Sequence, residues 1–165
     1  RRVLFRSSVF ESLVTEIVAG LVHHGFGNIY FLNGHGANLE PLKRVATGFP
    51  EVKIRIKSWW DFDAVNVLRD ENYGDWEGMH ATPSEVAITQ ATHRTLPAGD
   101  AEQPPEKLTA DYIKKHSGDR HGPPDEHRAQ FPDGRVGSHS ALASAGVGQE
   151  IIDAAVAALA AEFQD

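Results

Sequence analysis

The most informative segment of this chain is Asn28-Ile-Tyr-Phe-Leu-Asn33-Gly34-His35-Gly36-Ala37-Asn38. Its four consecutive apolar residues, 29–32, lie between glycines, which is typical of a short parallel strand buried in a sheet. In open α/β sheets, ligands bind at the carboxyl ends of the strands. His35 stands at this end, so we take it as a candidate site residue. The alternative is a tight turn that exposes His35 without giving it a function.

Helix and strand patterns alternate around this strand. A capping box at residues 8–11 starts an apolar helix that Gly25 ends, and rows 9, 13, 17, 21 and 10, 14, 18, 22 are expected on one buried face. A helix is expected over Leu39–Ala46, and the alternating segment Val52–Ile56 predicts a half-buried strand. Gln149–Phe163 is expected to be an amphipathic helix that packs on the sheet. Such alternation with short loops predicts an α/β layered sheet.

A second histidine lies in the segment Trp76-Glu-Gly-Met-His80-Ala-Thr82-Pro83-Ser-Glu85. Thr82 as N-cap, Pro83 at the first helical position and Glu85 three residues after the cap predict a helix start. His80 would then lie just before a helix N-terminus. A capping role alone would account for Glu85.

Together, the Asn33-Gly34-His35 loop and the His80-Ala-Thr-Pro-Ser-Glu85 segment resemble the creatininase (creatinine amidohydrolase) family. In that family an Asn-Gly-His loop follows a core strand, and a His-Ala-x-x-x-Glu motif further on opens a helix. The likeness covers most of the chain after Ser7. It implies a three-layer α/β/α sandwich with a mostly parallel sheet. It also implies a homo-oligomer, commonly a hexamer.

The resemblance implies a centre of two divalent metal ions, zinc or manganese. In it, His35 and Glu85 would each be a ligand of one ion, and His80 would be the catalytic proton-transfer residue. Trp76 falls where the family has a tryptophan that closes over the substrate. The expected substrate-binding residues are therefore Trp76, Gly34, Gly36 and Asn38.

Two departures from the family pattern stand out. Ala37 occupies the position where creatininase itself has a metal-binding glutamate, so creatinine is not the expected substrate. The family's Glu-x-His pair and bridging aspartate have no counterpart before Asn33. Residues 1–7 also match the translation of a common short-read sequencing adapter. We therefore expect residues 1–7 to be an artefact and residues 8–165 to be the C-terminal two-thirds of one domain that lacks its N-terminal strand and helix.

The amino-acid composition limits the partners and metal ligands that this chain can have. A formal charge of −7 over 165 residues makes nucleic acid a poor partner. The chain has no cysteine, so metal ligands must come from His, Asp and Glu. No apolar run reaches the ~20 residues of a membrane span, and a cytoplasmic location is the default expectation.

Three further regions leave alternatives open. The three tryptophans lie within Ser58–Met79, where we expect Trp59 or Trp60 at an interface and Trp76 at a pocket. The proline-rich segment Leu96–Arg135 is expected to be a long excursion with one short helix near Ala110–Lys115. Its three histidines are expected to be surface residues rather than ligands: His116, His121 and His127. We assign no catalytic role to Ser138-His139-Ser140.

The expected function is hydrolysis of a non-peptide C–N bond, of a cyclic amide or formamide type, by a metal-activated water. Two alternatives stay open. The chain could be a catalytically inactive fragment. It could also be a phosphate- or nucleotide-binding α/β module, in which residues 34–38 cradle a phosphate at the start of the next helix.

Overall fold

The computed structural model describes residues 7–117 and 122–163. The chain forms two compact units, residues 1–59 and 60–165, and each is described by itself. The expectations for residues 1–6 and for His121 lie outside the described residues.

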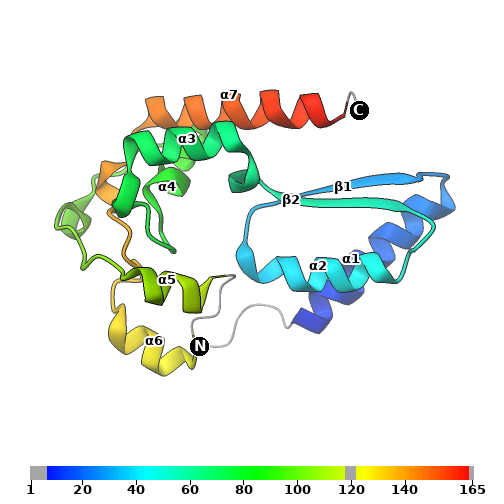
Figure 1. Ribbon diagram of the computed structural model, residues 1–165, viewed down its shortest axis with the longest axis horizontal. Coiled ribbons are helices and arrows are strands. Elements are labelled where there is room, and N and C mark those ends of the chain that lie inside the picture. The colour runs from blue at the N-terminus through cyan, green and yellow to red at the C-terminus, as the bar shows by residue number, and fades with distance from the viewer. Residues whose placement is uncertain (1–6, 118–121, 164–165) are drawn as a thin grey trace. The chain divides into compact units, whose positions relative to one another are not determined.

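The first unit places two helices on one face of two parallel strands. Its elements are α1 (Ser7–His23), β1 (Asn28–Asn33), α2 (Leu39–Thr47) and β2 (Lys53–Ser58). The strands pair in parallel from Asn28 opposite Lys53 to Asn33 opposite Ser58. Figure 1 shows α1 and α2 on the same side of the strands. The predicted α/β arrangement with a parallel sheet is confirmed for these elements.

The core of this unit lies between the strands and the helices. Buried residues from α1 and α2 contact the strand side chains on one face, and the contributing residues are Val14, Val18, Leu42, Val45, Ile29, Phe31, Ile54 and Ile56. Leu32, which the sequence analysis expected to be buried, is 50% exposed. Successive strand residues point to opposite faces, so Leu32 lies on the face that α1 and α2 do not cover.

Helix α1 buries only one of its two apolar rows. Phe10, Val14, Val18 and Val22 face the core, whereas Val9, Leu13 and Ile17 are 49%, 59% and 50% exposed. The prediction of one shared buried face was wrong because neighbouring residues in a helix are about 100° apart.

The end of α1 is set by Gly25, as predicted. Gly25 has φ 87°, and its N–H donates to Val22 O at 2.9 Å. The N–H of Phe26 donates to Leu21 O at 3.1 Å. This pair of bonds is the Schellman motif, which requires a left-handed residue that glycine adopts without steric cost.

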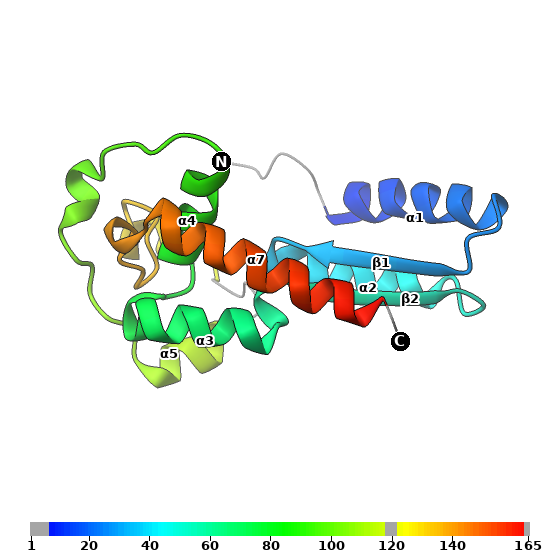
Figure 2. The same cartoon turned by 90° about the horizontal axis from the view of Figure 1, so that it is seen from above.

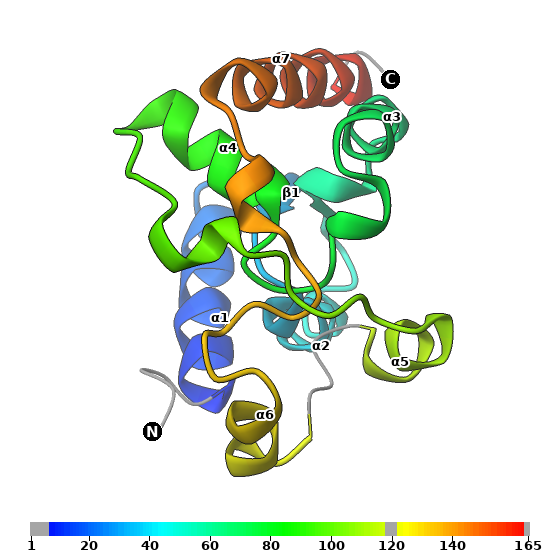
Figure 3. The ribbon, with the colours of Figure 1, turned by 90° about the vertical axis from the view of Figure 1, so that its left-hand side faces the viewer.

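The second unit is helical. Its helices are α3 (Asp63–Asn72), α4 (Pro83–Thr92), α5 (Ala110–His116), α6 (Pro124–Gln130) and α7 (Ala145–Glu162). α7 packs on α4 and also contacts α3, as Figures 2 and 3 show. A Cβ on Gly148 of α7 would lie 2.0 Å from Ala87 O in α4. This glycine therefore permits the close approach of the two helices.

Several predictions for this unit need correction. α7 begins at Ala145, four residues before the predicted start, because the Ser144 side chain caps it by accepting from Val147 N. Ile151 of α7 is fully buried, whereas Val156 is 60% exposed. The helices α3 and α6 were not predicted, whereas α5 was.

Two histidines of the long excursion also differ from expectation. His116 is half-buried, and its ring stacks on Tyr112 with the centroids 4.1 Å apart. His127 is half-buried as well, with its ring centroid 5.2 Å from that of Phe131. Aromatic neighbours, which the charged local sequence did not reveal, cover these two side chains.

Candidate active site

The loop after β1 is organised by the buried side chain of Asn33, which is 4% exposed. Its Nδ2 donates to His35 O at 2.9 Å and to Ser58 Oγ at 3.0 Å. Its Oδ1 accepts from His35 N at 3.2 Å and from Asn38 Nδ2 at 3.3 Å. Asn33 therefore ties the His35 loop to the ends of both strands.

His35 is exposed, and it precedes a 3₁₀ turn over Gly36–Asn38. Its Nδ1 accepts from Ala37 N at 3.2 Å. With Nδ1 as an acceptor, a neutral imidazole carries its proton on Nε2. A metal ion bound at Nε2 would need the other tautomer, so ligation by Nε2 requires the ring to release Ala37 N.

The second motif forms the helix start that the sequence predicts. Thr82 Oγ1 accepts from Glu85 N at 3.2 Å, and Glu85 Oε2 accepts from Thr82 N at 3.1 Å. These two bonds are a capping box, with Pro83 at the first helical position. Ala81 is the one non-glycine residue with positive φ, 53°, in residues 7–117 and 122–163. The exposed His80 is thus followed directly by a left-handed residue and then by the cap.

The segment 136–140 braces the segment 76–82. Met79 N donates to Val136 O at 2.9 Å, and Val136 N donates to His80 O at 3.3 Å. Ser140 Oγ donates to Ala81 O at 2.5 Å. A Cβ on Gly78 would lie 2.2 Å from Ser138 Oγ, and Gly78 has φ 63°. Both the conformation and the close contact require glycine there.

Trp76 is half-buried between two side chains. Its ring meets the ring of His139 edge-on, with the centroids 5.6 Å apart, and His139 N donates to Trp76 O at 2.9 Å. Lys107 Nζ lies 4.6 Å from the Trp76 ring centroid and 3.0 Å from Asp75 Oδ2. A cation over an indole face is a favourable contact, so the long excursion helps to position Trp76.

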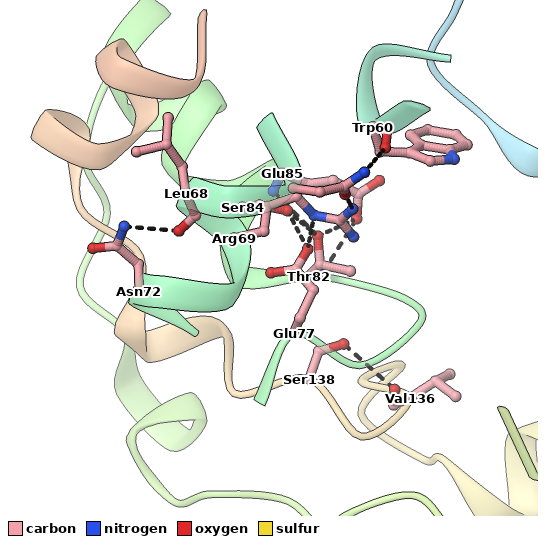
Figure 4. Close-up of polar contacts among 11 residues, drawn as sticks. Trp60, Leu68, Arg69, Asn72, Glu77, Thr82, Ser84, Glu85, Val136 and Ser138 are labelled. Carbon is pink, nitrogen blue, oxygen red and sulfur yellow. Dashed lines mark hydrogen bonds and ion pairs between the residues drawn. The ribbon is translucent and has the colours of Figure 1, made fainter. Parts of the chain in front are cut away.

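A buried polar cluster lies behind the helix start (Figure 4). Glu77 Oε1 accepts from Arg69 Nε at 3.1 Å and from Ser84 Oγ. Ser84 Oγ lies 3.0 Å from Thr82 Oγ1, which in turn lies 3.1 Å from Glu85 Oε2. Continuous hydrogen bonds therefore run from α3 to the candidate residue Glu85.

Tyr73 is buried near this cluster. Burial, followed by the negative charges of Glu77 and Glu150, raises the pKa of Tyr73 to about 12. Its hydroxyl makes no hydrogen bond within the part of the chain that the structure describes. The side chain therefore stays neutral at physiological pH.

The predicted site residues fall into two groups. Gly34, His35, Gly36 and Asn38 form one loop of the first unit, and Trp76, His80 and Glu85 lie together in the second unit. Imidazole and carboxylate donors suit zinc or manganese. No group of three or more His, Asp or Glu side chains that could hold a metal ion is found among the described residues. The donor types at these positions fit such an ion.

Four further residues contribute to this region: Glu77 and Lys107, which were not predicted, and His139 and Ser140, to which no catalytic role was assigned. Each acts on the motif through a contact that is distant in sequence or through a buried side chain. The glycines at 78 and 137, both with positive φ, were the available signal, since they mark a close backbone approach.

No helix in residues 7–117 and 122–163 is both long and apolar enough to cross a membrane.

Comparisons with known proteins agree with the geometry. A family model described as "Creatininase: Creatinine amidohydrolase" matches residues 3–163. A search of curated proteins finds no match.

Solved structures with a similar fold include the following two. A type II creatininase with a tryptophan-to-phenylalanine mutation has 19% identity and a TM-score of 0.71, and the match covers 97% of this chain and 64% of that one. A protein assigned as a creatinine amidohydrolase, from Bacteroides fragilis NCTC 9343, has 18% identity and a TM-score of 0.66, with 96% and 61% covered. The predicted creatininase-like α/β fold is confirmed, and the chain spans less than two-thirds of the length of these neighbours.

Proposed function

Because the chain belongs to the creatininase family, we propose that the protein is a metal-dependent amidohydrolase that cleaves a non-peptide C–N bond. The substrate class is a small cyclic amide or formamide. The observation that supports this most directly is the 76–85 segment, where Trp76 ends a 3₁₀ turn, His80 precedes the N-cap of α4, and Glu85 lies in the first turn of that helix. The 136–140 segment braces all of it.

Each residue has a role in this proposal. His80 donates a proton to the departing nitrogen, a task suited to an imidazole because it can both accept and give a proton near neutral pH. Trp76 covers the bound substrate and keeps water from it. His35 and Glu85 would hold metal, and the loop residues Gly34, Gly36 and Asn38 would contact the substrate. Two zinc or manganese ions, when bound, would supply an activated water and polarise the scissile carbonyl.

The phosphate-binding alternative finds little support in the loop. Three backbone N–H groups of residues 34–38 already have acceptors: His35 N donates to Asn33 Oδ1, Ala37 N to His35 Nδ1, and Asn38 N to His35 O. A phosphate at this turn would have to displace these bonds. The cytoplasmic location and the hexameric assembly stay predictions from sequence.

The test is turnover of cyclic amides and formamides by the purified chain in the presence of manganese or zinc. We expect His80→Ala to lower turnover by about 100-fold or more. His93→Ala is the matched control, since His93 is exposed and lies at the opposite end of α4. A chain that neither binds these metals nor turns over any member of the panel would support the inactive-fragment alternative.

A further inference from the structure

Glu77 is a buried carboxylate beside the candidate site. Its side chain is 12% exposed, and its partner Arg69 is 20% exposed. Burying two charges costs free energy unless both are paired and hydrogen-bonded. Here Oε1 takes both bonds, from Arg69 and Ser84, while the buried Oε2 makes no hydrogen bond to the described residues. Helix capping does not explain this arrangement, because a capping box needs only Thr82 and Glu85.

The hydrogen bonds from Glu77 have a fixed direction. A serine hydroxyl has one proton, and Ser84 gives it to the Glu77 carboxylate. Ser84 Oγ can then only accept from Thr82 Oγ1, 3.0 Å away. Thr82 Oγ1 accepts from Glu85 N, and its single proton is shared between Ser84 Oγ at 3.0 Å and Glu85 Oε2 at 3.1 Å. The charge on Glu77 therefore sets the orientation of both hydroxyls.

We propose that Glu77, acting through Ser84 and Thr82, is a positioning residue that orients the Glu85 carboxylate. Oε2 of Glu85 is held by Thr82 through two bonds, to the N–H and to the hydroxyl. This hold fixes the plane of the carboxylate and so the direction of Oε1. The effect of this orientation on metal binding rests on the proposed function. The hydrogen bonds from Glu77 through Ser84 and Thr82 to Glu85 do not depend on it. Groups that orient a metal ligand typically change metal affinity by about 10- to 100-fold.

The first measurement is amide hydrogen exchange by NMR in Ser84→Ala and Glu77→Gln. Ser84→Ala removes one oxygen from a fully buried position, and Glu77→Gln keeps the shape and removes the charge. We expect the Thr82 and Glu85 amides to exchange about 10-fold faster or more, while the amides of residues 88–91 keep their rates. Thr92→Ala and Glu71→Gln, which remove a hydroxyl group and a carboxylate charge at exposed positions, should alter neither set.

The second measurement is titration of the same four variants with manganese, which should bind about 10- to 100-fold more weakly to Ser84→Ala and Glu77→Gln than to the controls. Unchanged Thr82 and Glu85 exchange would overturn the positioning role, whatever the metal result. Faster exchange throughout the second unit would also overturn it, since it would show general loss of stability. If the two cap amides respond but the unmodified chain binds no metal, the positioning role stands and the proposed function fails.

Discussion

At the scale of single residues, Asn33 organises the loop that contains His35. Four hydrogen bonds meet on its buried amide. Asn33→Ala would remove the hydrogen bonds that this amide makes with Ser58 Oγ, His35 O and His35 N. We expect the free energy of unfolding to fall by about 2–4 kcal/mol, measured by urea denaturation.

The control for this substitution is Asn28→Ala, at the exposed start of the same strand. It should change the free energy of unfolding by less than about 0.5 kcal/mol. Equal effects of the two substitutions would mean that the buried amide does not organise the loop.

Tyr73 gives a prediction about pH. Its pKa is about 12 in the folded state, mainly because of burial, and about 10 in the unfolded chain. As pH rises from about 10 to 12, the unfolded state loses the phenolic proton first, so the free energy of unfolding falls. Tyr73→Phe should remove this part of the alkaline loss. At pH 7 it should leave stability equal or slightly higher, because it deletes a buried hydroxyl with no hydrogen bond to the described residues.

The measurement is the urea midpoint of both proteins from pH 7 to 11.5. If the urea midpoint falls equally with pH in Tyr73→Phe and in the unmodified chain, the raised pKa of Tyr73 is contradicted.

Local rules explain which site residues could be predicted. The roles of Thr82, Pro83 and Glu85 in the helix start follow from three adjacent positions, and the structure has this start. The roles of Asn33 and Glu77 depend on partners far away in sequence: Ser58 lies on the next strand, and Arg69 lies on α3. No pattern within one segment contains that information. Whether His35, His80 and Glu85 hold metal or move protons stays a prediction.

At the scale of elements, the crossing of α4 and α7 depends on one glycine. A Cβ at Gly148 would lie 2.0 Å from Ala87 O and 2.3 Å from Ala87 C, and a helix backbone cannot yield as a flexible side chain can. We expect Gly148→Ala to lower the free energy of unfolding by about 2 kcal/mol or more. Thermal unfolding would measure this loss.

Gly146→Ala is the matched control on the same helix, because a Cβ there would meet nothing within 4 Å. It should be neutral or stabilising by up to about 1 kcal/mol, since alanine favours helix. Equal effects of the two substitutions would show that the close approach of α4 and α7 at Gly148 does not decide the outcome.

The boundaries of elements were harder to predict than their types. The strands at residues 28–33 and 53–58 have short apolar or alternating patterns, and both were predicted. The Ser144 side chain caps the start of α7. The first turn of this helix contains Gly146 and Gly148, and glycine has a low helix propensity, so propensity alone places the start of the helix too late. The short helix α6 lies in a proline-rich segment, which by composition predicts a loop. Pro124 occupies the first position of this helix, where proline is favourable.

At the scale of the whole molecule, the exposed apolar row of α1 is the feature with the clearest consequence. Val9, Leu13 and Ile17 are about half exposed and lie four residues apart, so they form one continuous strip along the helix. Exposed apolar strips promote association. We expect Leu13→Glu to reduce self-association of the chain while leaving the free energy of unfolding within about 0.5 kcal/mol, because the core row of α1 is untouched.

Leu96→Glu is the control that separates the strip from general charge. Leu96 is 59% exposed, the same as Leu13, and both substitutions change the formal charge from −7 to −8 by adding one glutamate. Sedimentation velocity at several protein concentrations would compare the two variants with the unmodified chain. Added acidic charge alone raises solubility. If both variants reduce self-association equally, the effect is due to charge and the α1 strip is not the contact surface. A reduction confined to Leu13→Glu would identify the α1 strip as the surface through which copies of the chain associate.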